Sequence, residues 1–248
     1  MLTVRDASSG AKTPIAVAGG DMIGVGFVLP LMAGPFTCAR VLVVGDLLRR
    51  VIEDIHSAPV LAAVITNNHS AAERVCRSGL MVRPVVGMFA TEAEAGLGKP
   101  LDLVITVART NDAPAPRPPA IGLAPVRNAV PYPGAAPDTV RFALAHVNHT
   151  HQVNMTGSLL ESSRAVLDRW RDRVVEWSSH PSRPIPATWR TAVIAALDDD
   201  LDVAHVLAMM RELEDADNVE PGAKFEAFIY ADRVLAVDLM RDLGRIRC

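Results

Sequence analysis

The sequence predicts an α/β protein in which a Rossmann-like parallel sheet domain is followed by a C-terminal helical bundle. In the first hundred residues, short continuous apolar runs alternate with stretches of helical periodicity, the pattern of strands covered by helices. A segment with 8 of the 18 prolines follows, and helical periodicity alone is found beyond it. We therefore expect a sheet domain at 1–111, a proline-rich linker at 112–137 and a helical domain at 138–248.

The sheet domain is expected to contain buried strands. Five apolar runs predict strands or the loops beside them, at 15–20, 23–31, 59–66, 82–89 and 101–108. Apolar residues at helical spacing predict a helix at 39–56, and a shorter helix at 70–80 is expected to end at Gly79. Strand, helix and strand in this order favour a parallel sheet.

The helical domain is expected to hold five helices. Periodic stretches place them at 138–147, 158–177, 188–197, 197–217 and 221–240. Ser158 and Glu161 form a capping box for the second helix. The aspartates at 198–200 are expected to cap the fourth helix and not to bind a metal.

Charge and cysteine content limit the function. The net charge of −3 provides no broad basic surface, so tRNA is not an expected partner. Three cysteines without disulfide spacing, and a start without signal-peptide order, predict a cytoplasmic location. Residues 15–34 are apolar, but Asp21 and Pro30 argue against a membrane span.

A loop leads into a helix within Gly34–Arg50. Such a helix start is a common place for a nucleotide phosphate, although no glycine-rich phosphate motif is present. Cys38 lies where the helix dipole lowers a thiol pKa, so it is a candidate nucleophile. Thr37 and Arg40 beside it are candidate ligand-binding residues. The alternative is that Cys38 is a small buried residue at a tight turn.

Polar residues also follow two of the expected strands. Asn67, Asn68 and His69 come directly after one strand, and Arg109 and Asn111 come after another. Ligands of open α/β sheets bind at the carboxyl ends of the strands. His69 is therefore a candidate catalytic residue and the other four are candidate ligand-binding residues. A solvated turn is the alternative in both places.

The loop at 146–154 carries three histidines, His146, His149 and His151. An imidazole can act as an acid or a base near neutral pH, so His149 and His151 are candidate catalytic residues. Two imidazoles at this spacing could also bind a metal, but we predict no metal site. The alternative is a polar loop that only joins two helices.

Five segments are similar to parts of one known family. They are AALDDDLDVAHVLAMMRELEDA (195–216), the stretch before it at 137–170, CARVLVVGDLLRRVIED (38–54), VITNNHS (64–70) and GKPLDLVIT (98–106). The first two resemble the C-terminal helical region of cysteinyl-tRNA synthetases and of the related cysteine ligase of mycothiol synthesis. The third resembles the helix after the nucleotide-binding signature of that family. The resemblance implies a class I synthetase core, truncated, with a helical domain.

The chain departs from that family at its catalytic motifs. Pro35-Phe36-Thr37-Cys38 stand where the family has a His-Ile-Gly-His signature, and residues 121–130 lack the lysines of the second signature. Gly26 stands at the place of a zinc-binding cysteine. Adenylation needs groups that stabilise charge on the phosphates. We therefore expect neither ATP nor zinc as a cofactor, and no standard aminoacyl-tRNA ligase activity.

Three functions stay open at this point. The first is an ATP-independent enzyme of specialised metabolism that acts on a small amino-acid-derived substrate, with Cys38 and the histidines as reactive groups. The second is a non-catalytic pseudo-synthetase that binds a partner protein, a ligand or a tRNA. The third is a divergent cysteine-activating ligase in which Arg109 or Arg127 contacts phosphate. Apolar segments at 23–32 and 82–89 also predict a homodimer surface.

Overall fold

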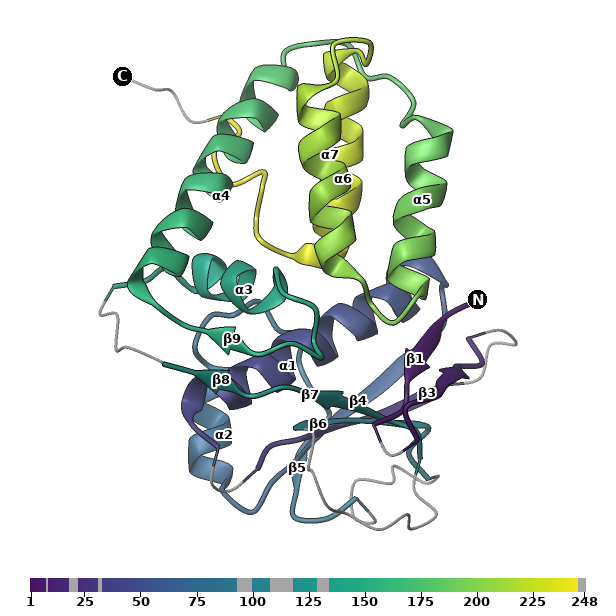
Figure 1. The fold of residues 1–248 in the computed structure, drawn as a ribbon, viewed down its shortest axis with the longest axis vertical. Coiled ribbons are helices and arrows are strands. Elements are labelled where there is room, and N and C mark those ends of the chain that lie inside the picture. Colours follow the sequence, from purple (N-terminus) through teal and green to yellow (C-terminus); the bar gives the residue numbers. More distant parts are fainter. Residues whose placement is uncertain are drawn as a thin grey trace.

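The computed structural model describes residues 1–7, 9–17, 22–30, 33–92, 100–107, 118–128 and 134–244. A group of helices stands on one face of a sheet that forms the base of the molecule (Figure 1). The predicted fold class, a Rossmann-like α/β sheet followed by helices, is confirmed. Within the described ranges, no helix is long and apolar enough to cross a membrane.

Five parallel strands form the central sheet. In chain order they are β3 (Ile23–Val28), β4 (Val60–Ile65), β5 (Met88–Phe89), β6 (Leu103–Val107) and β7 (Ala120–Leu123). In space the order is β5-β4-β3-β6-β7, with every pairing parallel. The chain therefore leaves β3 toward one edge and returns through β6 toward the other. The order reverses between β3 and β6, where ligands bind in open sheets of this kind.

Part of the predicted linker belongs to the sheet. Within 112–137, Ala120–Leu123 pairs with β6, and β8 (Val126–Arg127) pairs with β9 (Val153–Asn154). The interpretation of the whole segment as a linker is therefore wrong, and the sheet extends past the boundary predicted at residue 111. The prolines mislead because Pro118 and Pro119 precede the first residue of an edge strand, where their missing N–H groups cost no ladder hydrogen bond.

Helix α1 (Pro35–Arg50) covers the sheet and continues into a π-helical turn, η1 (Val51–Ile55). Most of α1 is buried, because the sheet lies on one side of it and the later helices lie on the other (Figure 1). Gly45 allows the close approach of α1 to β3, since a Cβ atom there would come within 2.5 Å of the Phe27 ring. The short helix α2 (His69–Cys76) follows β4.

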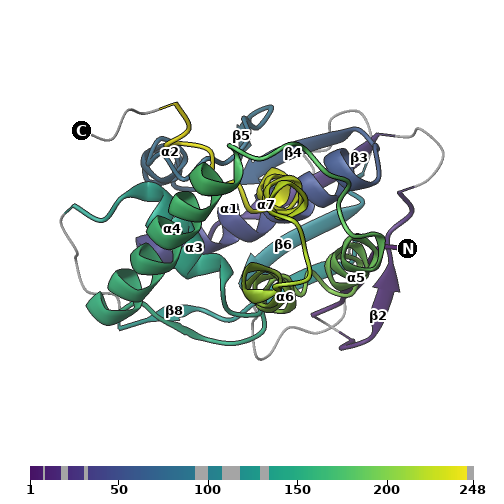
Figure 2. The same cartoon turned by 90° about the horizontal axis from the view of Figure 1, so that it is seen from above.

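Five helices form the second half of the chain: α3 (Pro137–Ala145), α4 (Gly157–Trp177), α5 (Ala187–Asp198), α6 (Val203–Asp215) and α7 (Pro221–Leu235). Seen from above, α4 to α7 surround a common centre (Figure 2). Trp170 lies in this core, and its ring meets Phe142 and Phe228 edge-on at centroid distances of 5.8 and 5.6 Å. Such aromatic pairs stabilise the packing beyond the area that they bury.

Two predicted helix caps differ from the structure. The N-cap of α4 is Thr156, whose hydroxyl accepts the Leu159 N–H at 3.2 Å, so the capping box expected at Ser158 is wrong. The N-cap of α6 is Asp202, which accepts the His205 N–H at 3.1 Å. The aspartates at 198–200 lie before this cap. They bind instead to the first half of the chain. Asp198 binds the His56 ring, Asp199 binds the Lys12 ammonium group, and Asp200 accepts the Arg5 N–H.

The sheet and the helices share one continuous hydrophobic core. A buried charge network also joins them. Arg141 of α3 and Arg50 of α1 both donate to Asp46 Oδ2, each at 2.6 Å. The hairpin of β1 (Thr3–Arg5) and β2 (Lys12–Pro14) adds the contacts to the aspartates. The two halves are therefore packed against each other as one unit.

Candidate functional site

The start of α1 lies at the carboxyl edge of the sheet, beside the point where the strand order reverses. Gly34 is the N-cap, with an extended backbone at φ −63° and ψ 158°. Pro35 follows as the first helical residue, and this end of α1 has neither a side-chain cap nor an acidic residue in its first turn. The helix dipole is therefore not compensated by a side chain here, which suits an anionic ligand group.

Thr37 and Arg40 are used by the fold. Thr37 is buried, and its hydroxyl accepts the Val126 N–H at 3.1 Å. Arg40 has no exposed surface, and its guanidinium donates to four carbonyl oxygens at 2.7 to 3.3 Å, those of Ala124, Val147, Asn148 and His151. Both side chains hold α1 to the loops that follow β7 and α3. The structure thus gives them a role in folding instead of the predicted ligand contact.

Cys38 is half-buried at the first turn of α1. Its Sγ lies 3.9 Å from the Ala33 carbonyl oxygen. Burial raises the pKa of the Cys38 thiol, and a backbone hydrogen bond opposes this effect only in part. The predicted lowering of this pKa is therefore wrong, because removal from water disfavours the thiolate more than the backbone hydrogen bond favours it. Cys38 is a thiol at neutral pH.

The end of β4 presents polar groups to solvent. Asn67 and His69 are exposed. Asn68 is the N-cap of α2, and its Oδ1 accepts the Ala71 N–H at 3.1 Å. A side-chain oxygen at this position satisfies a helix donor, so Asn68 is committed to the local fold. Asn67 and His69 keep their predicted roles as expectations.

The histidine loop faces the α5–α6 turn. His149 is 4% exposed, and its Nε2 lies 3.1 Å from the Asp200 carbonyl oxygen and 3.2 Å from Asp200 Oδ1. Burial raises the pKa of Asp200, but hydrogen bonds from His149 and the Arg5 N–H outweigh burial and leave it below its ordinary value. His151 is exposed, with Nδ1 3.3 Å from the Thr150 hydroxyl.

The predicted catalytic residues do not form a hydrogen-bonded set. Across the described ranges, no hydrogen bond joins any two of Cys38, His69, His149 and His151. A nucleophile and its base need such contact, at least in the bound state. Arg109 and Asn111 lie outside the described residues. Among the residues that the structure describes, no group of three His, Cys, Asp or Glu side chains could hold a metal ion.

The apolar segments predicted as a dimer surface differ in exposure. Ile23–Val28 is buried as the central strand β3, so the chain itself covers it. Within the second segment Val86 is 51% exposed, and Met81 directly before it is 39% exposed. The homodimer stays a prediction that depends on this second surface.

A charged pocket away from the sheet edge was not predicted from the sequence. It has a volume of about 320 Å³ and lies between α3 and α4, with Asp138, Arg164 and Arg241 in its wall. Arg171, which also lines the pocket, is 2% exposed. A signal was present, because Arg171 falls within the buried stripe of Leu167, Trp170 and Val174. An arginine inside such a stripe indicates a buried ion pair.

The chain has no match among protein-family models, and no curated protein is similar to it in sequence. The resemblance to cysteinyl-tRNA synthetases therefore stays a prediction. The observed fold class is compatible with it but does not test it.

Proposed function

We propose that the protein binds a small acidic, amino-acid-derived molecule at the carboxyl edge of its parallel sheet, without ATP. One observation carries the proposal. The uncapped start of α1, at Gly34 and Pro35, lies beside the point between β3 and β6 where the strand order reverses. A helix dipole at such a point attracts a carboxylate or a phosphate. Pro35 has no N–H, and the Thr37 and Cys38 N–H groups donate to the Gly34 oxygen, so the Phe36 N–H is the first-turn donor that an anion could use.

The neighbouring side chains support binding more than catalysis. Thr37 and Arg40 are committed to backbone groups, and Asn68 caps α2. Asn67 and His69 are exposed at the same sheet edge and could contact the rest of the ligand. With a thiol at Cys38 and no base hydrogen-bonded to it in the described part of the chain, ligand binding is the simpler function.

An ATP-independent enzyme is the second candidate. It is favoured by the position of Cys38, whose half-buried thiol lies on the first turn of α1 with only a long contact at 3.9 Å to the Ala33 oxygen. A ligand that brings its own base would convert this thiol into a nucleophile. The resemblance to a cysteine-activating family makes cysteine derivatives the first substrates to test.

The binding test is a calorimetric titration with a non-hydrolysable cysteinyl-adenylate analogue, and with cysteine and ATP alone. We expect the analogue or cysteine to bind and ATP alone to give no heat. Absence of binding by all three, together with no thermal stabilisation, would remove the proposed ligand class. Turnover of a bound cysteine derivative that is lost in Cys38→Ser, but kept in Cys76→Ser, would favour the enzyme.

A charge substitution at Gly34 locates the site. Gly34→Asp and Gly34→Asn both fit, because the backbone is extended and a Cβ atom there meets no atom of the described residues within 4 Å. Both side chains can cap α1 and stabilise it by a few tenths of a kcal/mol, ~0.3 relative to glycine. Only aspartate adds a negative charge, so it should weaken an anionic ligand about fivefold more than asparagine does. Equal effects would place the ligand elsewhere.

A further inference from the structure

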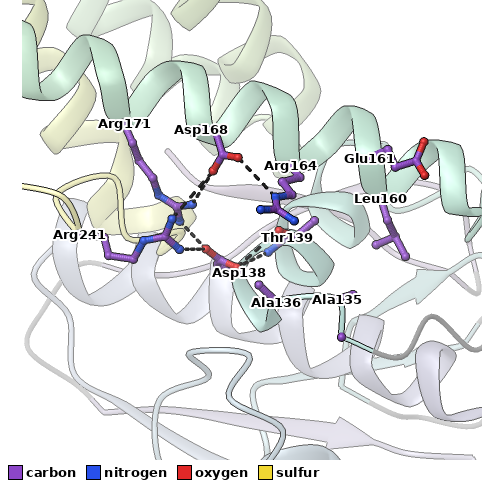
Figure 3. Close-up of a pocket in the computed structure, with 11 residues that line it drawn as sticks. Ala135, Ala136, Asp138, Thr139, Leu160, Glu161, Arg164, Asp168, Arg171 and Arg241 are labelled. Atoms are coloured by element: carbon purple, nitrogen blue, oxygen red, sulfur yellow. Dashed lines mark hydrogen bonds and ion pairs between the residues drawn. The ribbon is translucent and has the colours of Figure 1, made fainter. Parts of the chain in front are cut away.

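The pocket between α3 and α4 has two chemically different ends. Figure 3 shows Arg164, Arg171 and Arg241 at one end, with Asp138 and Asp168 between them. Leu160 and Glu161 lie at the other end, and Ala135 and Ala136 also line the pocket. At about 320 Å³, the pocket has room for a molecule of amino-acid size.

The arginine end combines three guanidinium groups with the carboxylates that pair with them. Asp138 Oδ2 accepts hydrogen bonds from Arg171 and from Arg241, the second at 2.9 Å. Asp168 lies farther from its partners, at 3.4 Å from Arg164, 3.7 Å from Arg171 and 3.9 Å from Arg241. Asp242 lies 3.6 Å from Arg241 Nε, so the three guanidinium groups face three carboxylates. The start of α3 adds little, because Asp138 in its first turn offsets the helix dipole.

The three arginines differ in how far their donors are used. Arg171 is fully committed, since it also donates to the carbonyl oxygens of Val237 and Asp238 at 2.6 and 3.1 Å. Arg164 is 76% exposed, and among the residues that the structure describes its one polar contact is the 3.4 Å bond to Asp168. Arg241 Nε is buried beside Asp242, at 3.6 Å, and is not open to a ligand. Arg241 Nη2 lies 3.9 Å from Asp168, which is too long for a hydrogen bond. Arg164 and the Nη2 group of Arg241 therefore retain donors for a ligand.

We propose that this pocket binds a small zwitterion of the amino-acid class, with its carboxylate at Arg164 and Arg241 and its ammonium group toward Glu161. A guanidinium binds a carboxylate through two parallel N–H donors. The half-exposed Asp168 is held by long, solvent-screened contacts, so a ligand carboxylate can replace it at little cost. A phosphate dianion fits less well, because Asp138 and Asp168 would repel it.

Glu161 and Leu160 define the second half of the ligand. Glu161 is exposed and has no hydrogen bond or ion pair with another described residue, so its carboxylate is available for an ammonium group. Leu160 is buried and, with Ala135, provides an apolar wall for a side chain. This site is separate from the sheet edge, and the inference does not depend on the function proposed there.

The test is a ¹⁵N NMR titration of the full chain with the twenty L-amino acids, each at millimolar concentration. Ethanolamine, which lacks a carboxylate, acetate, which lacks an ammonium group, and inorganic phosphate are the comparison probes. We expect at least one amino acid to shift the amide signals of Ala135, Thr139 and Leu160, and each comparison probe to bind far more weakly. No shift with any amino acid, or equal binding of phosphate, would overturn the inference.

Variants separate this pocket from the sheet edge. Arg164→Gln and Glu161→Gln should each weaken the bound amino acid by about tenfold, since each removes one charge-assisted contact. Arg77→Gln is the matched control, because Arg77 and Glu73 form an equally exposed i,i+4 pair outside the pocket. Cys38→Ser should leave the affinity unchanged. Unchanged affinity in Arg164→Gln, in a variant with wild-type thermal unfolding, would exclude the site.

Discussion

The middle and the start of α1 each hold a buried charge, and the partners of the two charges differ. In the middle, Asp46 accepts from Arg141 and Arg50 at 2.6 Å and from the Arg83 N–H at 2.8 Å. At the start, Arg40 is equally buried but meets only carbonyl oxygens. Its Nε has no hydrogen-bond partner in the described ranges. The charge in the middle of α1 is therefore compensated by opposite charges, whereas the start of α1 retains a positive charge.

The effects on the pKa values of Arg40 and Arg141 show the same difference. Burial lowers the pKa of Arg40 to about 10, and nothing opposes it. Burial also lowers the pKa of Arg141, but the charge of Asp46 opposes that shift. Because Arg40 stays protonated at neutral pH, its charge adds to the uncapped helix dipole at the same end of α1. This sum supports an anionic ligand at the sheet edge.

The largest effect is expected at Arg141. Arg141→Met removes a fully buried cation from Asp46, Leu80 and Leu235 and should lower the free energy of unfolding by about 3 kcal/mol or more. Urea unfolding followed by circular dichroism measures the change. Arg50→Met serves as the comparison and should cost less, because that side chain is 13% exposed and Arg141 still pairs with Asp46. A loss below about 1 kcal/mol for Arg141→Met would show that the joint is not structural.

A smaller loss is expected at Arg40. Arg40→Met leaves carbonyl oxygens without their donor, which costs about 1–3 kcal/mol. The same change removes a buried charge that lacks a carboxylate, and this relief offsets part of the loss. The same urea experiment measures it. If Arg40→Met were more destabilising than Arg141→Met, the contrast between the two regions would fail.

The two arginines also show what the sequence could predict. Continuous apolar runs predict the strands at 59–66 and 101–108, because strands buried on both faces have no polar side. The partner of a buried arginine is not a local property. Arg141 and Asp46 are 95 residues apart, and Arg40 meets Ala124 across 84 residues. Sequence reasoning therefore locates α1 but cannot decide which of its polar residues serve the fold.

The same limit explains the candidate site. The position of the helix start at the sheet edge follows from strand and helix order, so the place could be predicted. Whether Thr37 faces a ligand or the Val126 N–H depends on β8, within a segment whose prolines indicated a linker. The pKa of Cys38 depends on how far the folded chain buries the thiol, which the local sequence does not show.

A chemical test sharpens the contrast at the start of α1. Because burial raises the pKa of the Cys38 thiol, its alkylation by iodoacetamide at pH 7 should be slower than that of free cysteine, and should accelerate as the pH rises above 8. Peptide mass spectrometry follows Cys38 and Cys76 in the same sample. Cys76 is the internal control, since burial and Glu73 raise the pKa of its thiol as well. Rapid labelling of Cys38 alone at pH 6 would show a thiolate and would favour catalysis.

The smallest effect is expected at His146, whose pKa is affected by the charge of Arg40. Burial lowers the pKa of His146, and the charges of Arg211 and Arg40 lower it further, although a hydrogen bond to the Ala143 oxygen opposes them. The folded state therefore binds fewer protons than the unfolded state once the pH falls below about 6.5. Stability should decline as the pH falls from 7.5 to 5, and His146→Gln should make that decline shallower.

The exposed His180→Gln is the matched control for this measurement and should leave the pH dependence unchanged. Thermal unfolding at several pH values gives the comparison. The Arg40→Met variant can be examined in the same way, because it removes one of the charges that act on His146. NMR titration of the His146 ring should then show a higher pKa in Arg40→Met than in the wild type. An unchanged pKa would mean that the Arg40 charge is compensated after all, and the case for an anionic ligand at this end of α1 would lose that support.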